Sequence, residues 1–114
     1  MKNVNIHSEG KQLTVTPTTD DLMRGNCRQF RKHVTEKIDG KNDRIKIDLS
    51  RAQKIDACGL NTLAVLKKRA DEKNVKLSIS NIKSNYTRNV LEIASMDELF
   101  QIENTEYSKP LKST

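Results

Sequence analysis

The feature that most constrains this fold is a change of hydrophobic period between Arg44 and Ala70. Ile45, Ile47 and Leu49 alternate with polar residues, which is the two-residue period of a half-buried strand. After a short polar turn the period lengthens, and it places four residues on one side of a helix: Leu60, Leu63, Ala64 and Ala70. A strand, a polar turn and a helix N-terminus form a place where a partner or an anion can dock.

The residues before this stretch predict a hairpin and a long helix. Apolar alternation at Val4 and Ile6, and again at Leu13 and Val15, predicts two strands joined by a turn at residues 8–11. Thr18–Asp21 then supply the side-chain oxygens and the acidic charge that suit a helix start. The apolar residues of the helix follow at spacings of three and four: Met23, Cys27, Phe30, Val34 and Ile38. The helix is expected to stop at Gly40.

The residues after the central helix predict a strand at 75–79 and a helix capped by Ser84 or Asn85. The expected apolar face of that helix consists of Tyr86, Val90, Leu91 and Ala94. A short terminal element at 97–102 and a polar C-terminal tail at 104–114 complete the chain.

These elements predict an α/β fold with the order β-β-α-β-α-β-α. A helix that crosses between two strands implies parallel pairing, and the first hairpin adds an antiparallel edge. We therefore expect a single small domain over residues 1–103, with a mixed, mostly parallel β-sheet of four to five strands packed with about four helices.

Charge raises the question of nucleic acid, because 21 basic residues exceed 15 acidic ones and the formal charge is +6. The basic residues are interleaved with acidic ones, and the four aromatic residues are too dispersed to form a base-stacking platform. Nucleic-acid binding is therefore the third functional hypothesis, after two kinds of protein binding. It predicts an affinity for nucleic acid that falls steeply with salt.

The sequence gives no support for an enzyme, a metal or a membrane segment. His7 and His33 lie at no ligand spacing, and the chain has no phosphate-binding glycine loop and no cofactor motif. No apolar run has the length of a membrane span and no signal peptide is evident, so a cytoplasmic protein is expected. Cys27 and Cys58 occur in unrelated contexts, which predicts two reduced thiols.

Several runs of residues resemble the STAS domain, the family of bacterial anti-sigma factor antagonists and of sulfate-transporter C-terminal domains. The resemblance is strongest in Ile47-Asp-Leu-Ser50 and Ile55-Asp-Ala-Cys-Gly-Leu60. It continues in Val75-Lys-Leu-Ser-Ile-Ser-Asn81, Val90-Leu-Glu-Ile-Ala94 and Met96-Asp-Glu-Leu-Phe100. Together these runs extend the resemblance over most of the chain.

The resemblance implies a bacterial regulatory module that binds proteins and has no enzymatic activity. In antagonists of this family the turn often reads Asp-Ser-Ser-Gly, and a partner kinase, itself an anti-sigma factor of ATPase fold, phosphorylates the second Ser. That position is Cys58 here, which cannot be phosphorylated. The alternative is an accessory subunit of a phospholipid transporter that docks on its ATPase, where the turn reads Asp-Thr-Ala-Gly and the Thr position is Ala57 here.

The expected partner-binding surface combines the turn, the outer face of the following helix and a loop that the resemblance implies lies beside them. Its members are Thr19, Asp20, Asp56, Ala57, Cys58, Gly59, Leu60, Asn61, Thr62 and Val65. Asp56 would cap the helix, face a cation of the partner, or do both. Val65 lies opposite the buried side of the helix. Cys58 is either a redox-sensing thiol or a small replacement for Ser.

Overall fold

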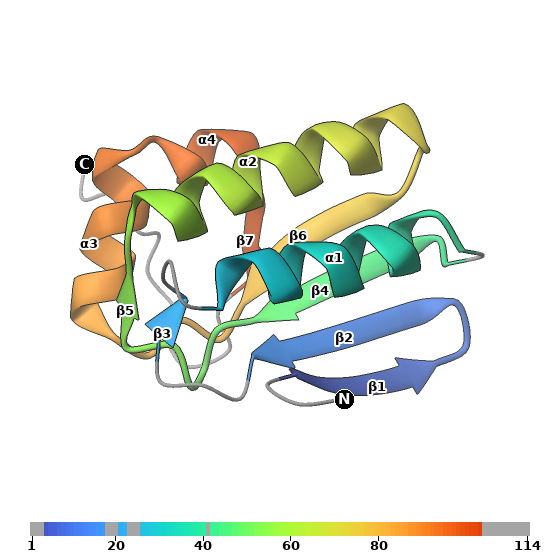
Figure 1. Ribbon diagram of the computed structural model, residues 1–114, viewed down its shortest axis with the longest axis horizontal. Helices are drawn as coiled ribbons and strands as arrows, with labels where there is room; N and C mark the ends of the chain where they lie inside the picture. Colours follow the sequence, from blue (N-terminus) through green and yellow to red (C-terminus); the bar gives the residue numbers. More distant parts are fainter. Residues whose placement is uncertain (1–3, 18–20, 23–25, 41, 104–114) are drawn as a thin grey trace.

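The structure is a computed structural model that describes residues 4–17, 21–22, 26–40 and 42–103. The described elements follow the expected order, with an additional pair of two-residue strands and with a short helix and a last strand where the terminal element was expected (Figure 1). They are β1 (Val4–Glu9), β2 (Gln12–Pro17), β3 (Asp21–Leu22), α1 (Cys27–Ile38), β4 (Arg44–Asp48), β5 (Lys54–Ile55), α2 (Ala57–Glu72), β6 (Lys76–Ser80), α3 (Asn85–Ile93), α4 (Met96–Leu99) and β7 (Gln101–Glu103).

Five strands form the main sheet in the order β1-β2-β4-β6-β7. β1 and β2 are antiparallel, whereas β2, β4, β6 and β7 are parallel to their neighbours. The register places Val15 beside Ile47 and Ile47 beside Ile79, so that one row of fully buried side chains crosses the sheet. The predicted α/β fold with a mixed, mostly parallel sheet and four helices is confirmed.

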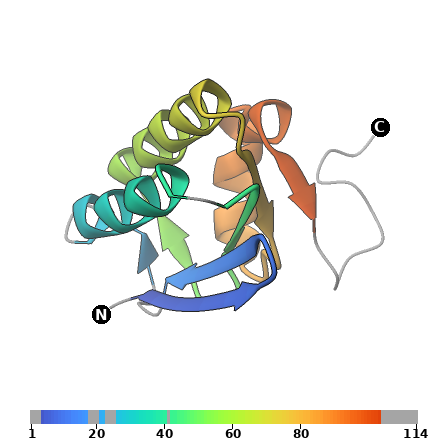
Figure 2. The same ribbon diagram turned by 90° about the vertical axis from the view of Figure 1, so that its right-hand side faces the viewer.

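Helices α1 and α2 lie side by side along one face of the sheet (Figures 1 and 2). Their buried residues recur at helical spacings of three and four, and they include Phe30, Val34, Ile38, Leu63, Leu66 and Ala70. At the C-terminal end of this pair, the Arg69 guanidinium donates two hydrogen bonds of 2.9 Å to the Asp39 carboxylate. The packing fixes how the starts of the two helices lie relative to each other.

The start of α1 differs from the sequence prediction. The described helix begins at Cys27, and Asp21–Leu22 form strand β3, which pairs in parallel with β5. The prediction of a helix start at Asp21 is therefore wrong, because pairing with a strand more than thirty residues away determines the backbone of this segment. Residues 18–20 and 23–25 lie outside the described residues.

The predicted hairpin turn and helix cap are confirmed, whereas one residue of α3 departs from its predicted position. Gly10 turns the first hairpin with a φ of +61°, and Ser84 caps α3 by accepting a hydrogen bond from the Thr87 N–H. Tyr86 was expected on the buried face, but it is 54% exposed. The Thr87 hydroxyl donates to the Ala52 carbonyl instead, so the buried side of α3 is turned away from Tyr86.

Candidate functional site

The turn that opens α2 is held by its own acidic side chain. Asp56 has an extended backbone, and its carboxylate accepts a hydrogen bond of 3.0 Å from the Gly59 N–H. This bond satisfies one of the free N–H groups of the first helical turn. The structure thus confirms the capping role of Asp56, which gives the following residues a defined geometry.

The first three turns of α2 present a mixed surface. Ala57 and Asn61 are exposed, Cys58 and Leu60 are partly exposed, and Val65 is 39% exposed. Gly59 and Thr62 are buried instead, so they face the protein interior. We call the exposed or partly exposed set the docking surface, which comprises Asp56, Ala57, Cys58, Leu60, Asn61 and Val65.

The pairing of β3 with β5 brings a distant segment to this turn. Asp21 lies opposite Lys54, and Leu22 lies opposite Ile55, the residue immediately before Asp56. Figure 1 shows β3 and β5 close to the starts of α1 and α2. The loop that precedes β3 was expected beside the turn, and the position of Asp21 agrees with this, but Thr19 and Asp20 lie outside the described residues.

A disulfide between Cys27 and Cys58 joins the first turns of α1 and α2. The prediction of two reduced thiols is therefore wrong. The two cysteines are 31 residues apart in sequence, with Cα atoms 6.3 Å apart. Local spacing could not reveal this pair, because it is the packing of α1 against α2 that brings them together. Cys27 is fully buried, whereas Cys58 is partly exposed within the docking surface.

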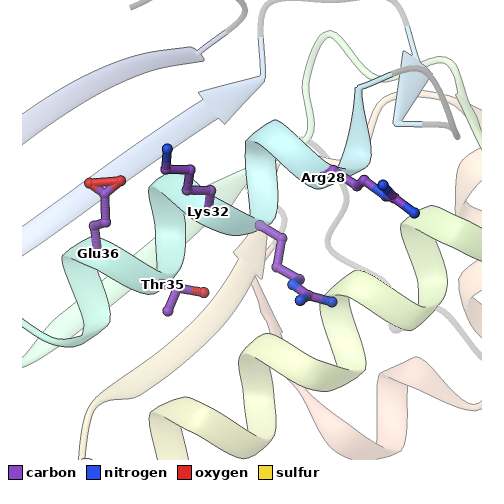
Figure 3. Close-up of a pocket in the computed structure, with 5 residues that line it drawn as sticks. Arg28, Lys32, Thr35 and Glu36 are labelled. Atoms are coloured by element: carbon purple, nitrogen blue, oxygen red, sulfur yellow. The ribbon is translucent and has the colours of Figure 1, made fainter.

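A basic pocket lies on α1, next to its disulfide-bonded start. The pocket has a volume of about 520 Å³ and is lined by Arg28, Arg31, Lys32, Thr35 and Glu36. In Figure 3 the side chains of Lys32 and Glu36 point to the same side of the helix, and Arg28 extends in another direction. Along the sequence these basic residues are interleaved with acidic ones, so a pocket was not expected here. The spacing of three and four between Arg28, Arg31 and Lys32 was the signal that they share a helix face.

Two charged residues with shifted pKa values lie at the end of the helix pair opposite the disulfide. The hydrogen bond from Arg69 lowers the pKa of Asp39 below its ordinary value, and the hydrogen bond to Asp39 raises the pKa of Arg69. This pairing favours the charged form of both side chains. The disulfide thus ties the starts of α1 and α2, and an ion pair ties their C-terminal ends.

Two other kinds of feature are absent from the described part of the chain. Within it, no group of three or more His, Cys, Asp or Glu residues is placed to hold a metal ion. None of its helices has both the length and the apolar character that crossing a bilayer requires.

Solved structures with the same fold include several anti-sigma factor antagonists. A Thermotoga maritima protein, described as a candidate anti-sigma factor antagonist, has a TM-score of 0.82 at 17% identity over 90% of this chain and 86% of that chain. An anti-sigma factor antagonist from Mycobacterium paratuberculosis has a TM-score of 0.78 at 13% identity over 88% and 83% of the two chains. SpoIIAA of Bacillus, in its unphosphorylated form, has a TM-score of 0.74 at 13% identity over 90% of each chain.

Comparison of the sequence with protein families gives a match over nearly the whole chain. No curated protein matches the sequence. The model of the STAS domain, however, matches residues 5–108. This range contains the described strands from the second residue of β1 onward, the disulfide and the docking surface. The chain belongs to the STAS domain family.

Proposed function

We propose that this protein is a non-enzymatic regulatory module of the anti-sigma factor antagonist type, which binds a protein partner in the cytoplasm through its docking surface. The observation that carries the proposal is the partly exposed first turn of α2 beside the β3–β5 pair. The proposed partner is a serine-kinase anti-sigma factor of ATPase fold, or a related switch protein. Structural neighbours that are themselves anti-sigma factor antagonists support this choice.

The chemistry of the docking surface suits protein recognition. Val65 and the partly exposed Leu60 offer apolar area, and Asn61 offers both a hydrogen-bond donor and an acceptor. The Asp56 cap fixes the backbone that carries these side chains, so little conformational freedom is lost on binding. Gly59 and Thr62 support this surface from inside and would make no contact with a partner.

The charge next to the docking surface indicates the character of the partner. Arg28, Arg31 and Lys32 line the pocket on α1, and among its described lining residues only Glu36 is acidic. A positive patch beside an apolar contact favours a partner with acidic groups at the facing edge. Such charges would raise the rate of association at low ionic strength more than they would raise the final affinity.

The docking surface lacks the phosphate acceptor that the family resemblance would lead one to expect. Position 57 holds Ala, and position 58 holds a Cys whose sulfur is bonded to Cys27. Neither side chain has a hydroxyl, so a serine kinase has no acceptor at these two positions. Partner binding in this protein is therefore not controlled by phosphorylation at the turn.

A binding measurement with two matched variants tests the proposal. The purified serine-kinase anti-sigma factor of the same organism is titrated with the wild type, Val65→Glu and Ile6→Glu in a calorimeter. The two positions are 39% and 38% exposed, but Ile6 lies on β1, outside the docking surface. Placing a charge in the centre of an apolar contact should weaken the affinity by about 30-fold or more in Val65→Glu.

Ile6→Glu should leave the affinity unchanged, which makes it the control for added charge. Equal affinities for wild type and Val65→Glu would place the interface on another surface. The same mixtures are incubated with ATP and digested, and the peptide that contains residues 56–60 is examined for phosphate. Phosphate on that peptide would contradict the loss of the phosphorylation switch.

A further inference from the structure

We propose that the Cys27–Cys58 disulfide is a reversible redox switch that controls the docking surface. The disulfide form, which the structure describes, is the form that binds a partner, and reduction weakens binding by releasing the first turn of α2 from α1. The effect on binding rests on the proposed function. The thiol chemistry and the structural response are properties of the chain itself and can be tested without a partner.

The two sulfur atoms have different environments, which sets the direction of attack. Cys58 is partly exposed, between the exposed residues Ala57 and Asn61, whereas Cys27 is fully buried. An incoming thiol therefore reaches Cys58, and Cys27 is the leaving group. Cys27 is the first residue of α1, where the helix dipole is positive. The positive end of the helix then stabilises the departing thiolate, which speeds exchange.

The chemical step is a thiol–disulfide exchange with a dithiol reductant of the thioredoxin class. A reductant thiolate attacks the Cys58 sulfur, the S–S bond breaks, and its electron pair leaves with the Cys27 sulfur, which takes a proton from water. The second reductant thiol attacks the mixed disulfide and releases Cys58, which is also protonated. Two electrons enter the protein, and the reductant becomes a disulfide. In the reverse direction, glutathione disulfide accepts two electrons and two protons from the thiols and becomes two glutathione molecules.

The position of the disulfide confines the structural response to one end of the molecule. Beyond the disulfide, both helices are anchored in the hydrophobic core by buried residues that include Val34 and Leu66, and the Asp39–Arg69 ion pair joins their C-terminal ends. Breaking the disulfide therefore frees the starts of the two helices while their C-terminal halves remain packed. The freed end is the one that carries the docking surface, so a partner must then order it again at a cost in affinity.

The first experiment measures the redox equilibrium of the native full-length chain. The protein is equilibrated in glutathione buffers that range from fully reduced to fully oxidised, and free thiols are trapped with a maleimide reagent of high mass. We expect one transition between zero and two labelled thiols within this range. A disulfide that persists under native conditions in excess reduced glutathione would overturn the proposal, as would two free thiols in excess glutathione disulfide.

A pair of single variants tests the direction of attack. Cys27→Ser leaves Cys58 alone on the surface, and Cys58→Ser leaves Cys27 alone in the interior. The mixed disulfide with glutathione, followed by mass spectrometry, should form at least about tenfold faster in Cys27→Ser. Equal rates would refute the assignment of Cys58 as the attacked sulfur.

The second experiment locates the structural response by amide NMR of the oxidised and reduced wild type. Chemical-shift changes should concentrate at residues 26–31 and 56–61, with little change around Asp39 and Arg69. Loss of spectral dispersion throughout the chain would instead identify the disulfide as a staple without which the domain does not fold, and the switch would be rejected.

The binding arm uses the same serine-kinase anti-sigma factor as the probe. Its affinity for the reduced wild type, and for the Cys27→Ser/Cys58→Ser double variant, should be at least about tenfold weaker than for the oxidised protein. Equal affinities for the oxidised and reduced forms would overturn the switch. If the oxidised protein does not bind the probe at all, the proposed function fails, while the redox titration and the NMR comparison still decide the chemistry of the pair.

Discussion

Reduction of the Cys27–Cys58 disulfide should lower the stability of the domain by an amount that follows from its place in the chain. The two cysteines are separated by 31 residues, so the bond closes a loop that contains the whole of α1, β4 and β5. In the unfolded chain, this closure excludes the many conformations in which the two ends of the loop lie apart. Reduction restores those conformations and therefore favours unfolding.

The size of the effect can be worked out from the loop length. The chain-entropy relation gives a loss of about 12 cal/mol/K for a loop of this length, or about 4 kcal/mol at 25 °C. A chain of 114 residues has an unfolding entropy of about 0.24 kcal/mol/K. Dividing the two values gives an expected fall in Tm of about 15 °C. Domains of this size have a stability of about 5–15 kcal/mol, so the reduced protein is expected to remain folded at 25 °C.

Thermal unfolding followed by circular dichroism, with and without a dithiol reductant, measures this difference. Urea unfolding at 25 °C provides an independent free energy. The Cys27→Ser/Cys58→Ser double variant is the control, because its midpoint should equal that of the reduced wild type and should not respond to the reductant. A wild-type midpoint that is the same in both redox states would refute the reasoning, since it would mean that no loop is closed in the native protein.

Three further perturbations test the packing, the cap and the helix-end ion pair. Leu66→Ala removes a fully buried side chain and should cost about 3 kcal/mol in urea unfolding; a cost below about 1 kcal/mol would contradict its core position. Asp56→Ala removes the bond to the Gly59 N–H and should cost about 1 kcal/mol, and an unchanged midpoint would contradict the cap. Arg69 lowers the pKa of Asp39, so the pair stabilises the fold above the ordinary carboxyl pKa of 3.8 and this contribution disappears as the pH falls through the lower folded value. Asp39→Asn should therefore lower the Tm slightly at neutral pH and not at the acid end, whereas a constant difference at all pH values would contradict the ion pair.

Much of the fold could be predicted because its signals are local. The alternation at Ile45, Ile47 and Leu49 predicts a half-buried strand with these residues on its inner face, and all three are fully buried. Asp56 and Ser84 were expected as helix caps on their side-chain chemistry, and each accepts the expected hydrogen bond. These features depend on neighbours within one or two turns of the chain, and the sequence displays those neighbours directly.

Part of the candidate site could be predicted in the same way. The polar turn before α2 and the outward position of Val65 follow from the helical period alone. Thr62 was placed on the same surface, but it is buried. The period only divides a helix into sides, and how far an adjacent element covers a residue depends on the packing of the whole domain.

The sequence by itself determined the order of strands and helices and the start of α2, because periodicity and capping act between residues a few positions apart. Only the tertiary structure decided that Asp21–Leu22 form strand β3, which pairs with β5 beside the turn that opens α2. It also decided that Cys27 bonds to Cys58. The chain of thirty or so residues between the members of each pair can take many paths. Packing of the apolar faces of α1 and α2 on the sheet selects the path that brings them together.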